Sequence, residues 1–186
     1  MRKLILFNMM TLDGLFEGPD RDISWHHVDD EFNDFAIEQL KSADGLLFGR
    51  LTYELMAAYW PTPEALGDDP VVAGLMNDLP KIVASRTLNK VSWNNSWLVK
   101  EDISGEISRL KAQPGKDFLL FGSADLARTL LQEHLIDEIR VIINPLVLGG
   151  GSPLFKEIRQ PVQLKLLSNK VFKNGNVLLY YEPLKS

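Results

Sequence analysis

Two short glycine turns carry the residue types best suited to binding phosphate. One turn runs from Gly49 to Thr52 and follows the apolar run Leu46-Leu47-Phe48; the other, Gly122-Ser123-Ala124, follows Phe118 to Phe121. Each run is typical of a buried strand, and each turn leads into an amphipathic segment, so each turn should open a helix. Backbone N–H groups at a helix N-terminus favour a phosphate. Two such turns indicate a ligand with more than one phosphate, such as a dinucleotide.

The side chains at these turns suit the same ligand. Thr52 and Ser123 have small hydroxyl groups near helix starts, where they can cap the helix or donate to phosphate oxygens. Arg50 and Arg86 have planar, permanently charged guanidinium groups that are suited to bidentate binding of phosphate. Arginines after two separate strands favour NADPH, because NADH has no 2′-phosphate. The alternative is that the glycines only permit tight turns and the arginines form surface ion pairs.

Composition excludes several other functions. The 186 residues are enough for one well-packed domain, and a net charge of −5 argues against a nucleic-acid partner. The chain has no cysteine, which excludes disulfides, thiolate catalysis and zinc–sulfur sites. His26 and His27 are adjacent and His134 is the one other histidine, so we expect no metal site. Ser123 has no second glycine after it, which argues against a serine hydrolase.

The N-terminus begins with Arg2 and Lys3 before an apolar run, but no small-residue cleavage site follows. We interpret this run as the first buried strand and expect a cytoplasmic location. No apolar run approaches the ~20 residues that a membrane span requires, so we expect no membrane contact.

Hydrophobic periodicity predicts alternating strands and helices over the first two thirds of the chain. Three strand-like runs without a helix between them then follow, and Asn174-Gly175 predicts a tight turn between the last two. This pattern predicts one α/β domain with a mixed sheet. No helix pattern follows Gly149-Gly150-Gly151, which predicts a loop near the mouth of an active site. The expected strands are 3–10, 45–48, 81–85, 97–99, 118–121, 136–148, 162–172 and 177–183; the expected helices are 29–43, 52–59, 71–78, 102–112 and 124–133, with 60–70 a loop.

Five sequence blocks occur in an order that identifies a family resemblance. They are MTLDG (10–14), LLFGRLTYE (46–54), KIVASRTL (81–88), FGSADL (121–126) and LIDEIRVIINPLVLGGGSPLF (135–155). Together they resemble a stand-alone RibD C-terminal domain, of the dihydrofolate reductase-like superfamily. The resemblance implies one domain over residues 1–186 with a mixed, mostly parallel central sheet, flanking helices and antiparallel C-terminal strands. It also implies a homodimer.

The resemblance further implies that NADPH binds in extended form along the strand ends. The implied cofactor contacts are Gly49, Arg50 and Thr52 to the phosphates, Ser85 and Arg86 to the adenosine ribose and its 2′-phosphate, Gly122, Ser123 and Ala124 beneath the pyrophosphate, and Asn8 and Met9 beside the nicotinamide. Asp13 falls near the nicotinamide as well.

Hydride transfer to a C=N bond also needs a proton source. In dihydrofolate reductases a tryptophan precedes the substrate-binding carboxylate by a few residues, and Trp25 has a similar spacing to Asp30. Asp30 and Asp13 are therefore the catalytic candidates. The alternatives are that Asp30 is an ordinary acid at a helix start and that Asp13 is a turn residue beside Gly14. If the Asp30 side chain points to bulk solvent, away from the strand ends, the role passes to Asp13 or to water.

The function implied is NADPH-dependent reduction of a pyrimidine- or pterin-like heterocycle. The leading substrate is the 5-amino-6-(5-phosphoribosylamino)uracil of riboflavin biosynthesis, and the alternative is dihydrofolate. The phosphate of the uracil substrate would need cations near the nicotinamide. The glutamate tail of dihydrofolate would need an arginine along the substrate cleft. A non-catalytic nucleotide-binding module remains the alternative from another class.

Overall fold

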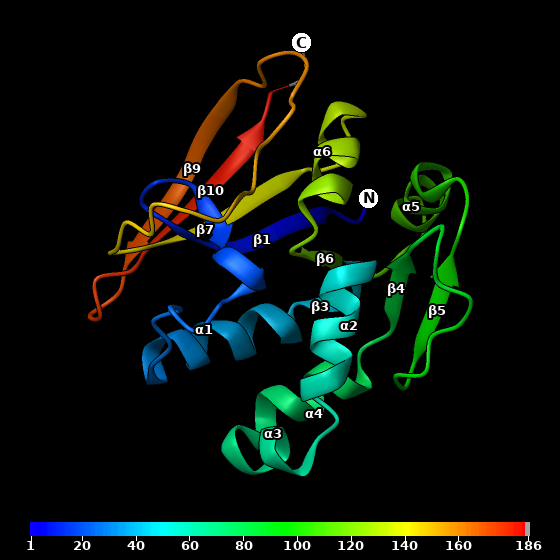
Figure 1. Ribbon diagram of the computed structural model, residues 1–186. Coiled ribbons are helices and arrows are strands. Elements are labelled where there is room, and N and C mark those ends of the chain that lie inside the picture. Colours follow the sequence, from blue (N-terminus) through cyan, green and yellow to red (C-terminus); the bar gives the residue numbers. More distant parts are fainter. Residues whose placement is uncertain (185–186) are drawn as a thin grey trace.

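The computed structural model describes residues 1–184 and is built around an eight-stranded sheet, shown in Figure 1. The strand order is β5-β4-β3-β6-β1-β7-β10-β9. The first six are parallel to one another, and β10 is antiparallel to both β7 and β9. The strands are β1 Leu4–Thr11, β3 Ala43–Gly49, β4 Lys81–Ala84, β5 Ser96–Val99, β6 Asp117–Phe121, β7 Glu138–Asn144, β9 Leu164–Val171 and β10 Val177–Pro183. The predicted mixed, mostly parallel sheet with antiparallel C-terminal strands is confirmed.

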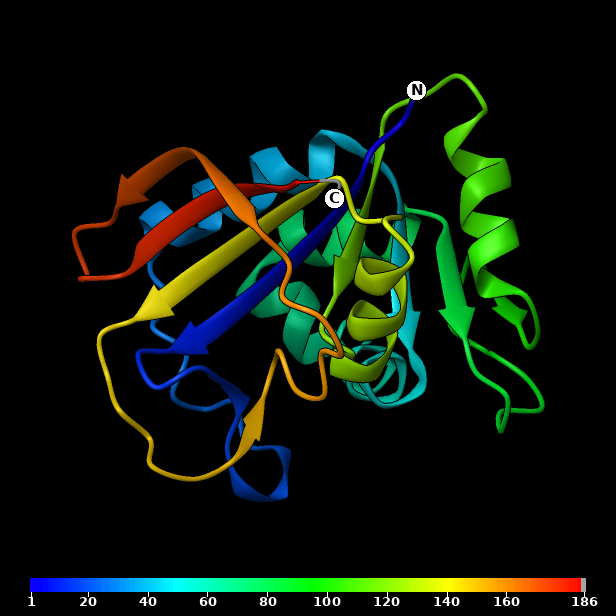
Figure 2. The same cartoon turned by 90° about the horizontal axis from the view of Figure 1, so that it is seen from above.

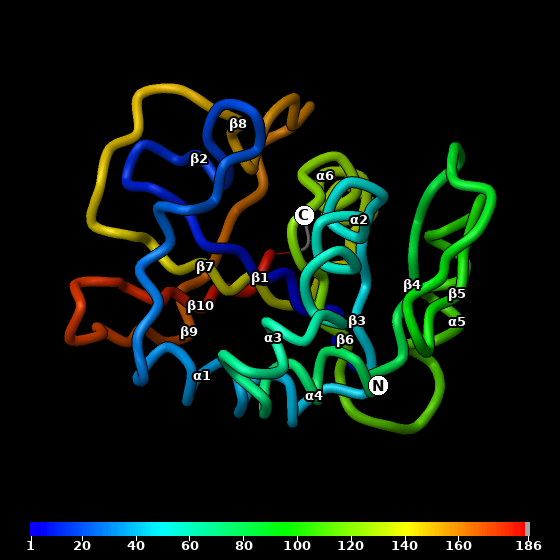
Figure 3. The backbone as a smooth tube through the Cα atoms, turned by 60° about the horizontal axis from the view of Figure 1, so that its bottom comes forward, coloured from blue at the N-terminus to red at the C-terminus, as the bar shows by residue number. Residues whose placement is uncertain are grey.

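A second, two-stranded sheet pairs β2 (Leu15–Glu17) with β8 (Ser152–Pro153). It joins the loop after β1 to the loop after β7. Figure 3 shows these two loops side by side at one end of the main sheet. Both strands are too short for a periodic signal, and the sequence did not predict them.

Within the described residues six α-helices connect the strands: α1 Asp30–Lys41, α2 Arg50–Tyr59, α3 Pro63–Asp68, α4 Pro70–Asp78, α5 Ile103–Lys111 and α6 Ala124–Gln132, with a 3₁₀ turn, η1, at Pro19–Arg21. The side chains of Asp29, Thr62, Asp69 and Asp102 accept N–H hydrogen bonds at the starts of α1, α3, α4 and α5. These bonds satisfy N–H groups that lack a partner inside the helix. The helices α2 and α6 begin at Gly49 and Ser123 without such a cap.

The helices cover the two faces of the sheet, as Figure 2 shows from above. Leu40, Tyr53 and Met76 bring α1, α2 and α4 against one face. Ile107 and Leu130 bring α5 and α6 against the other face. The central strands are therefore buried on both sides, which explains their almost continuous apolar sequences.

Two elements differ from expectation. Residues 60–70 contain α3, because Thr62 caps it and a proline at the first helical position costs no hydrogen bond. The run predicted at 136–148 ends as a strand at Asn144, before Pro145. It pairs parallel to β1 rather than belonging to the antiparallel group, because α6 returns the chain to the starting end of the sheet.

Candidate functional site

The two predicted phosphate-binding turns lie side by side. The strands β3 and β6 are parallel neighbours, so the turns that follow them emerge at the same edge of the sheet (Figure 3). The Gly49 N–H group donates to Ser123 Oγ at 2.8 Å. Ser123 Oγ also hydrogen bonds with Thr52 Oγ1 at 2.9 Å. The two turns, 74 positions apart in the sequence, therefore form one structural unit.

The packing of this unit explains both glycines. A Cβ atom at Gly49 would lie 2.5 Å from Ser123 Oγ, and one at Gly122 would lie 2.6 Å from Thr52 Oγ1. Gly122 also has a φ of +60°, which a residue with a side chain adopts with strain. Each glycine thus makes room for the hydroxyl side chain of the other turn.

The third contribution comes from β1, the neighbour of β6. The Gly122 N–H group donates to the buried Oδ1 of Asn8 at 2.9 Å, which fixes the second turn to the central strand. Ala124, the first residue of α6, is buried beneath this turn. The side chain of Met9 packs into the core with Phe35, so any contact with a cofactor stays a prediction.

This arrangement concentrates positive potential at one point. The uncapped starts of α2 and α6 leave N–H groups without an intrahelical partner, and the positive ends of both helix dipoles meet there. An anion is the ligand that such a place favours.

Cations surround this edge of the sheet. Arg50 is exposed at the start of α2, and its Nη1 pairs with Glu54 at 3.1 Å. Arg86 is exposed just after β4. Ser85 accepts hydrogen bonds at Oγ from the N–H groups of Thr87 and Leu88, so its hydroxyl shapes the turn that carries Arg86.

Lys100 directly follows β5 and was not among the cations predicted from the sequence. Its position is set by the Ser85 N–H group, which donates to Val99 O at 3.0 Å and holds the ends of β4 and β5 together. A signal was present: residues 81–100 contain four cations and no acid. Lys100 and Arg86 are thus the cations of this stretch placed at the edge of the sheet where the strands end.

Asp13 has a well-defined place on the opposite side of β1. Its carboxylate accepts hydrogen bonds from the N–H groups of Gly149 and Leu148, at 2.8 and 3.2 Å. The Thr11 hydroxyl and these two N–H groups lower the pKa of Asp13 to about 2. Asp13 is therefore ionised at neutral pH and holds the loop after β7, which contains the three glycines. A loop was predicted there, and the structure has one.

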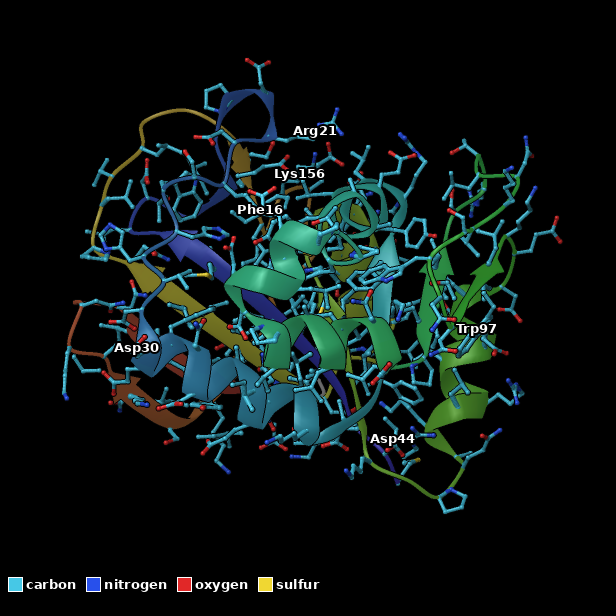
Figure 4. All side chains as sticks on the ribbon, turned by 90° about the horizontal axis from the view of Figure 1, so that it is seen from below. Phe16, Arg21, Asp30, Asp44, Trp97 and Lys156 are labelled. Carbon is cyan, nitrogen blue, oxygen red and sulfur yellow. The ribbon has the colours of Figure 1, made fainter. Side chains whose placement is uncertain are left out.

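Asp30 lies in the first turn of α1, and its side chain is exposed (Figure 4). His27 attaches the preceding segment to the end of β7 and to the start of β10. The His27 N–H group donates to Asn144 Oδ1 at 2.9 Å, and its carbonyl accepts from Asn176 Nδ2 at 2.8 Å. Both asparagines are fully buried. The start of α1 is thus held at the edge where the central strands end, and the catalytic role of Asp30 stays a prediction.

A surface hollow lies apart from the glycine turns, lined by Asn77, Ser92 and Trp93. Trp93 Nε1 donates to Asn77 Oδ1 at 2.7 Å, so these polar groups are already paired. Within residues 1–184 no group of three or more histidine or acidic side chains is arranged to hold a metal ion. No helix in that range is both long and apolar enough to cross a bilayer.

Comparison with known proteins shows the family and the fold. The RibD C-terminal domain family matches residues 2–178. The uncharacterized protein YyaP of Bacillus subtilis (strain 168) is 35% identical over 182 residues, which cover 97% of this chain and 94% of that protein. Among solved structures, a putative riboflavin biosynthesis protein from Shewanella sp. PV-4 has a TM-score of 0.76 and 24% identity, covering 98% of this chain and 99% of that one. A dihydrofolate reductase from Enterococcus faecalis complexed with NADP(H) has a TM-score of 0.66 and 14% identity, covering 98% and 97%. The chain belongs to the RibD C-terminal domain family.

Proposed function

We propose that this protein is an NADPH-dependent oxidoreductase. The observation that carries the proposal is the meeting of two uncapped helix N-termini, joined through Ser123 and Gly49, at the ends of adjacent parallel strands. Such a site suits the pyrophosphate of a dinucleotide. The name of the Enterococcus faecalis neighbour, which includes NADP(H), supports the choice of cofactor.

The position of the cations indicates how the cofactor would be oriented along the strand ends. Arg50 lies in the first glycine turn, after β3, and Arg86 and Lys100 follow β4 and β5 on the side of this turn away from β6. These cations would pair with the 2′-phosphate. Asn8 and Met9 lie on the β1 side, which is the side left for the nicotinamide. When bound there, NADPH would supply a hydride to the substrate.

The proposed substrate is a pyrimidine- or pterin-like heterocycle. Family membership and the Shewanella neighbour, whose name refers to riboflavin biosynthesis, favour the ribosylamino-pyrimidine of that pathway, with dihydrofolate as the alternative. Asp13 is ionised and bound to the Gly149 loop, so it is poorly placed to donate a proton. We therefore propose that Asp30, or water that reaches it, supplies the proton.

Two further properties belong to the proposal. The apolar run after Arg2 and Lys3 is the central strand β1 and thus part of the folded core, which is consistent with a cytoplasmic protein. The exposed edge strand β9 is consistent with a homodimer.

A titration with NADPH tests the function. We expect a change in nucleotide fluorescence on binding, and oxidation of NADPH when a ribosylamino-pyrimidine or dihydrofolate is added. Binding without oxidation by any pterin or pyrimidine would favour a non-catalytic nucleotide-binding module. Failure to bind NADPH would contradict both.

A further inference from the structure

Ser123 has an unusual conformation for the residue that begins a helix. Its φ of 59° and ψ of 68° place it in the left-handed region, which residues other than glycine, asparagine and aspartate seldom occupy. Its hydroxyl does not cap α6 but turns to α2, where it accepts from the Gly49 N–H group and pairs with the Thr52 hydroxyl. A glycine would adopt this backbone at less cost. The side chain, rather than the backbone, is therefore the feature that needs an explanation.

The contacts between the two turns are reciprocal. Ser123 of the second turn occupies the space beside Gly49 of the first, and Thr52 of the first occupies the space beside Gly122 of the second. Asn8 holds Gly122 from below. The pairing of β3 with β6 brings the two helix starts together, and Ser123 makes the two hydrogen bonds that join them, one to the Gly49 N–H group and one to the Thr52 hydroxyl.

We propose that Ser123 is a positioning residue, which locks the starts of α2 and α6 into a single cradle for two adjoining phosphates. This inference rests on the proposed function. The Ser123 hydroxyl already accepts one N–H group and contacts Thr52, so the free N–H groups in the first turns of the two helices make the phosphate contacts. The lock therefore matters for a diphosphate that touches both turns, and little for a ligand whose phosphates are separated.

Two ligands separate these cases. NADPH contains adjoining phosphates, whereas adenosine 2′,5′-bisphosphate has the same 2′-phosphate but no diphosphate. We expect Ser123→Ala and Thr52→Val each to raise the Kd for NADPH about tenfold, the scale of one lost hydrogen bond. The Kd for adenosine 2′,5′-bisphosphate should change less than about twofold. The double variant should bind NADPH no more weakly than Ser123→Ala alone, because Ser123→Ala already breaks the contact that Thr52→Val removes.

Three further variants serve as controls. Thr52→Ser keeps the hydroxyl and should restore binding. Ser123→Gly relieves the strain of the left-handed backbone but removes the hydroxyl, so its Kd for NADPH should still rise about tenfold. Thr129→Val removes a hydroxyl of α6 that bonds only within its helix, to Asp125 O, and should leave both affinities unchanged. Melting temperatures identify any variant that loses binding through general unfolding.

The outcomes are distinct. Losses that multiply in the double variant would show that each hydroxyl contacts the ligand separately, and would overturn the lock. Wild-type affinity in Ser123→Gly would also overturn it. If wild-type protein fails to bind NADPH, the proposed function fails instead. In that event, exchange of the Gly49 amide hydrogen tests the lock directly: it should exchange faster in Ser123→Ala, and equal protection would contradict the link.

Discussion

The carboxylate of Asp13 holds the backbone of Gly149, which donates its N–H group at 2.8 Å across 136 positions of sequence. This bond ties the loop after β1 to the loop after β7, beside the pairing of β2 with β8. Both loops border the edge of the sheet where the glycine turns lie. The Asp13 carboxylate thus fixes these two loops relative to each other.

This bond predicts a response to acid. The pKa of Asp13 is lowered from 3.8 to about 2. Its hydrogen bonds therefore stabilise the two joined loops above about pH 4, and this stabilisation is lost as the pH falls through 2. Asp13→Asn should remove this dependence and increase hydrogen exchange at residues 146–153 at neutral pH. An unchanged exchange rate in the variant would contradict the role of the bond. Asp20→Asn, at an exposed acid of η1, is the control.

Cofactor preference should depend on Arg86. Arg86→Ala should weaken NADPH binding by about 1.5–3 kcal/mol, the usual scale for a hydrogen bond to a charged group. NADH binding should hardly change, because NADH lacks the 2′-phosphate. Lys90→Ala, at an exposed cation of the same stretch, controls for a general loss of charge. Equal losses for the two cofactors would refute the assignment.

Proton supply can be assigned with matched carboxamide variants. Asp30→Asn should lower kcat by about 10²-fold, the scale of general acid–base catalysis, without changing the Kd for NADPH. Asp34→Asn, an exposed acid one turn further along α1, should have no effect. A change below about fivefold in Asp30→Asn would transfer the role to water.

Lys81 should be important for stability. Its buried ammonium donates to the carbonyls of Met76, Asn77 and Leu79 at the end of α4, at 2.7–2.9 Å. Lys81→Met would leave these carbonyls without their donor, and we expect a loss of about 3 kcal/mol in the free energy of unfolding. Urea denaturation would measure it, with Lys90→Met as the surface control. A loss below about 1 kcal/mol would show that the carbonyls find other partners.

The same lysine predicts a pH dependence. Burial lowers the pKa of Lys81 from 10.5 to about 8, so the unfolded chain binds more protons between these values. Wild-type stability should therefore rise, relative to Lys81→Met, as the pH increases from about 8 to 10.5. A difference that stays constant over this range would contradict the lowered pKa.

Edge strand β9 should mediate self-association. All eight of its residues are exposed, and Leu166 and Val171 are 50% and 67% exposed. An uncovered edge of this kind favours pairing with another chain. Light scattering should give twice the 21.0 kDa chain mass, and Leu166→Lys should give the monomer mass. Leu12→Lys, at an exposed leucine of the β1–β2 loop, should remain dimeric. A monomeric wild type would refute the homodimer.

The sequence by itself determined most of the fold. Strands buried on both faces are recognisable because they need continuous apolar residues, as in Leu4 to Met10 and Phe118 to Phe121. The glycine turns were also recognisable, since each follows an apolar run directly and leads into an amphipathic segment. Both signals depend only on residues that are close together in the sequence.

Only the tertiary structure decided which of these residues meet. The contact between Ser123 and Gly49 and the bond between Asp13 and Gly149 each join segments far apart in the chain. They exist because parallel strands place their following turns at one edge, a consequence of strand order that periodicity does not encode. Lys100 was missed for a related reason: the cation-rich stretch 81–100 does not indicate which of its cations lies at the strand ends until β5 is placed beside β4.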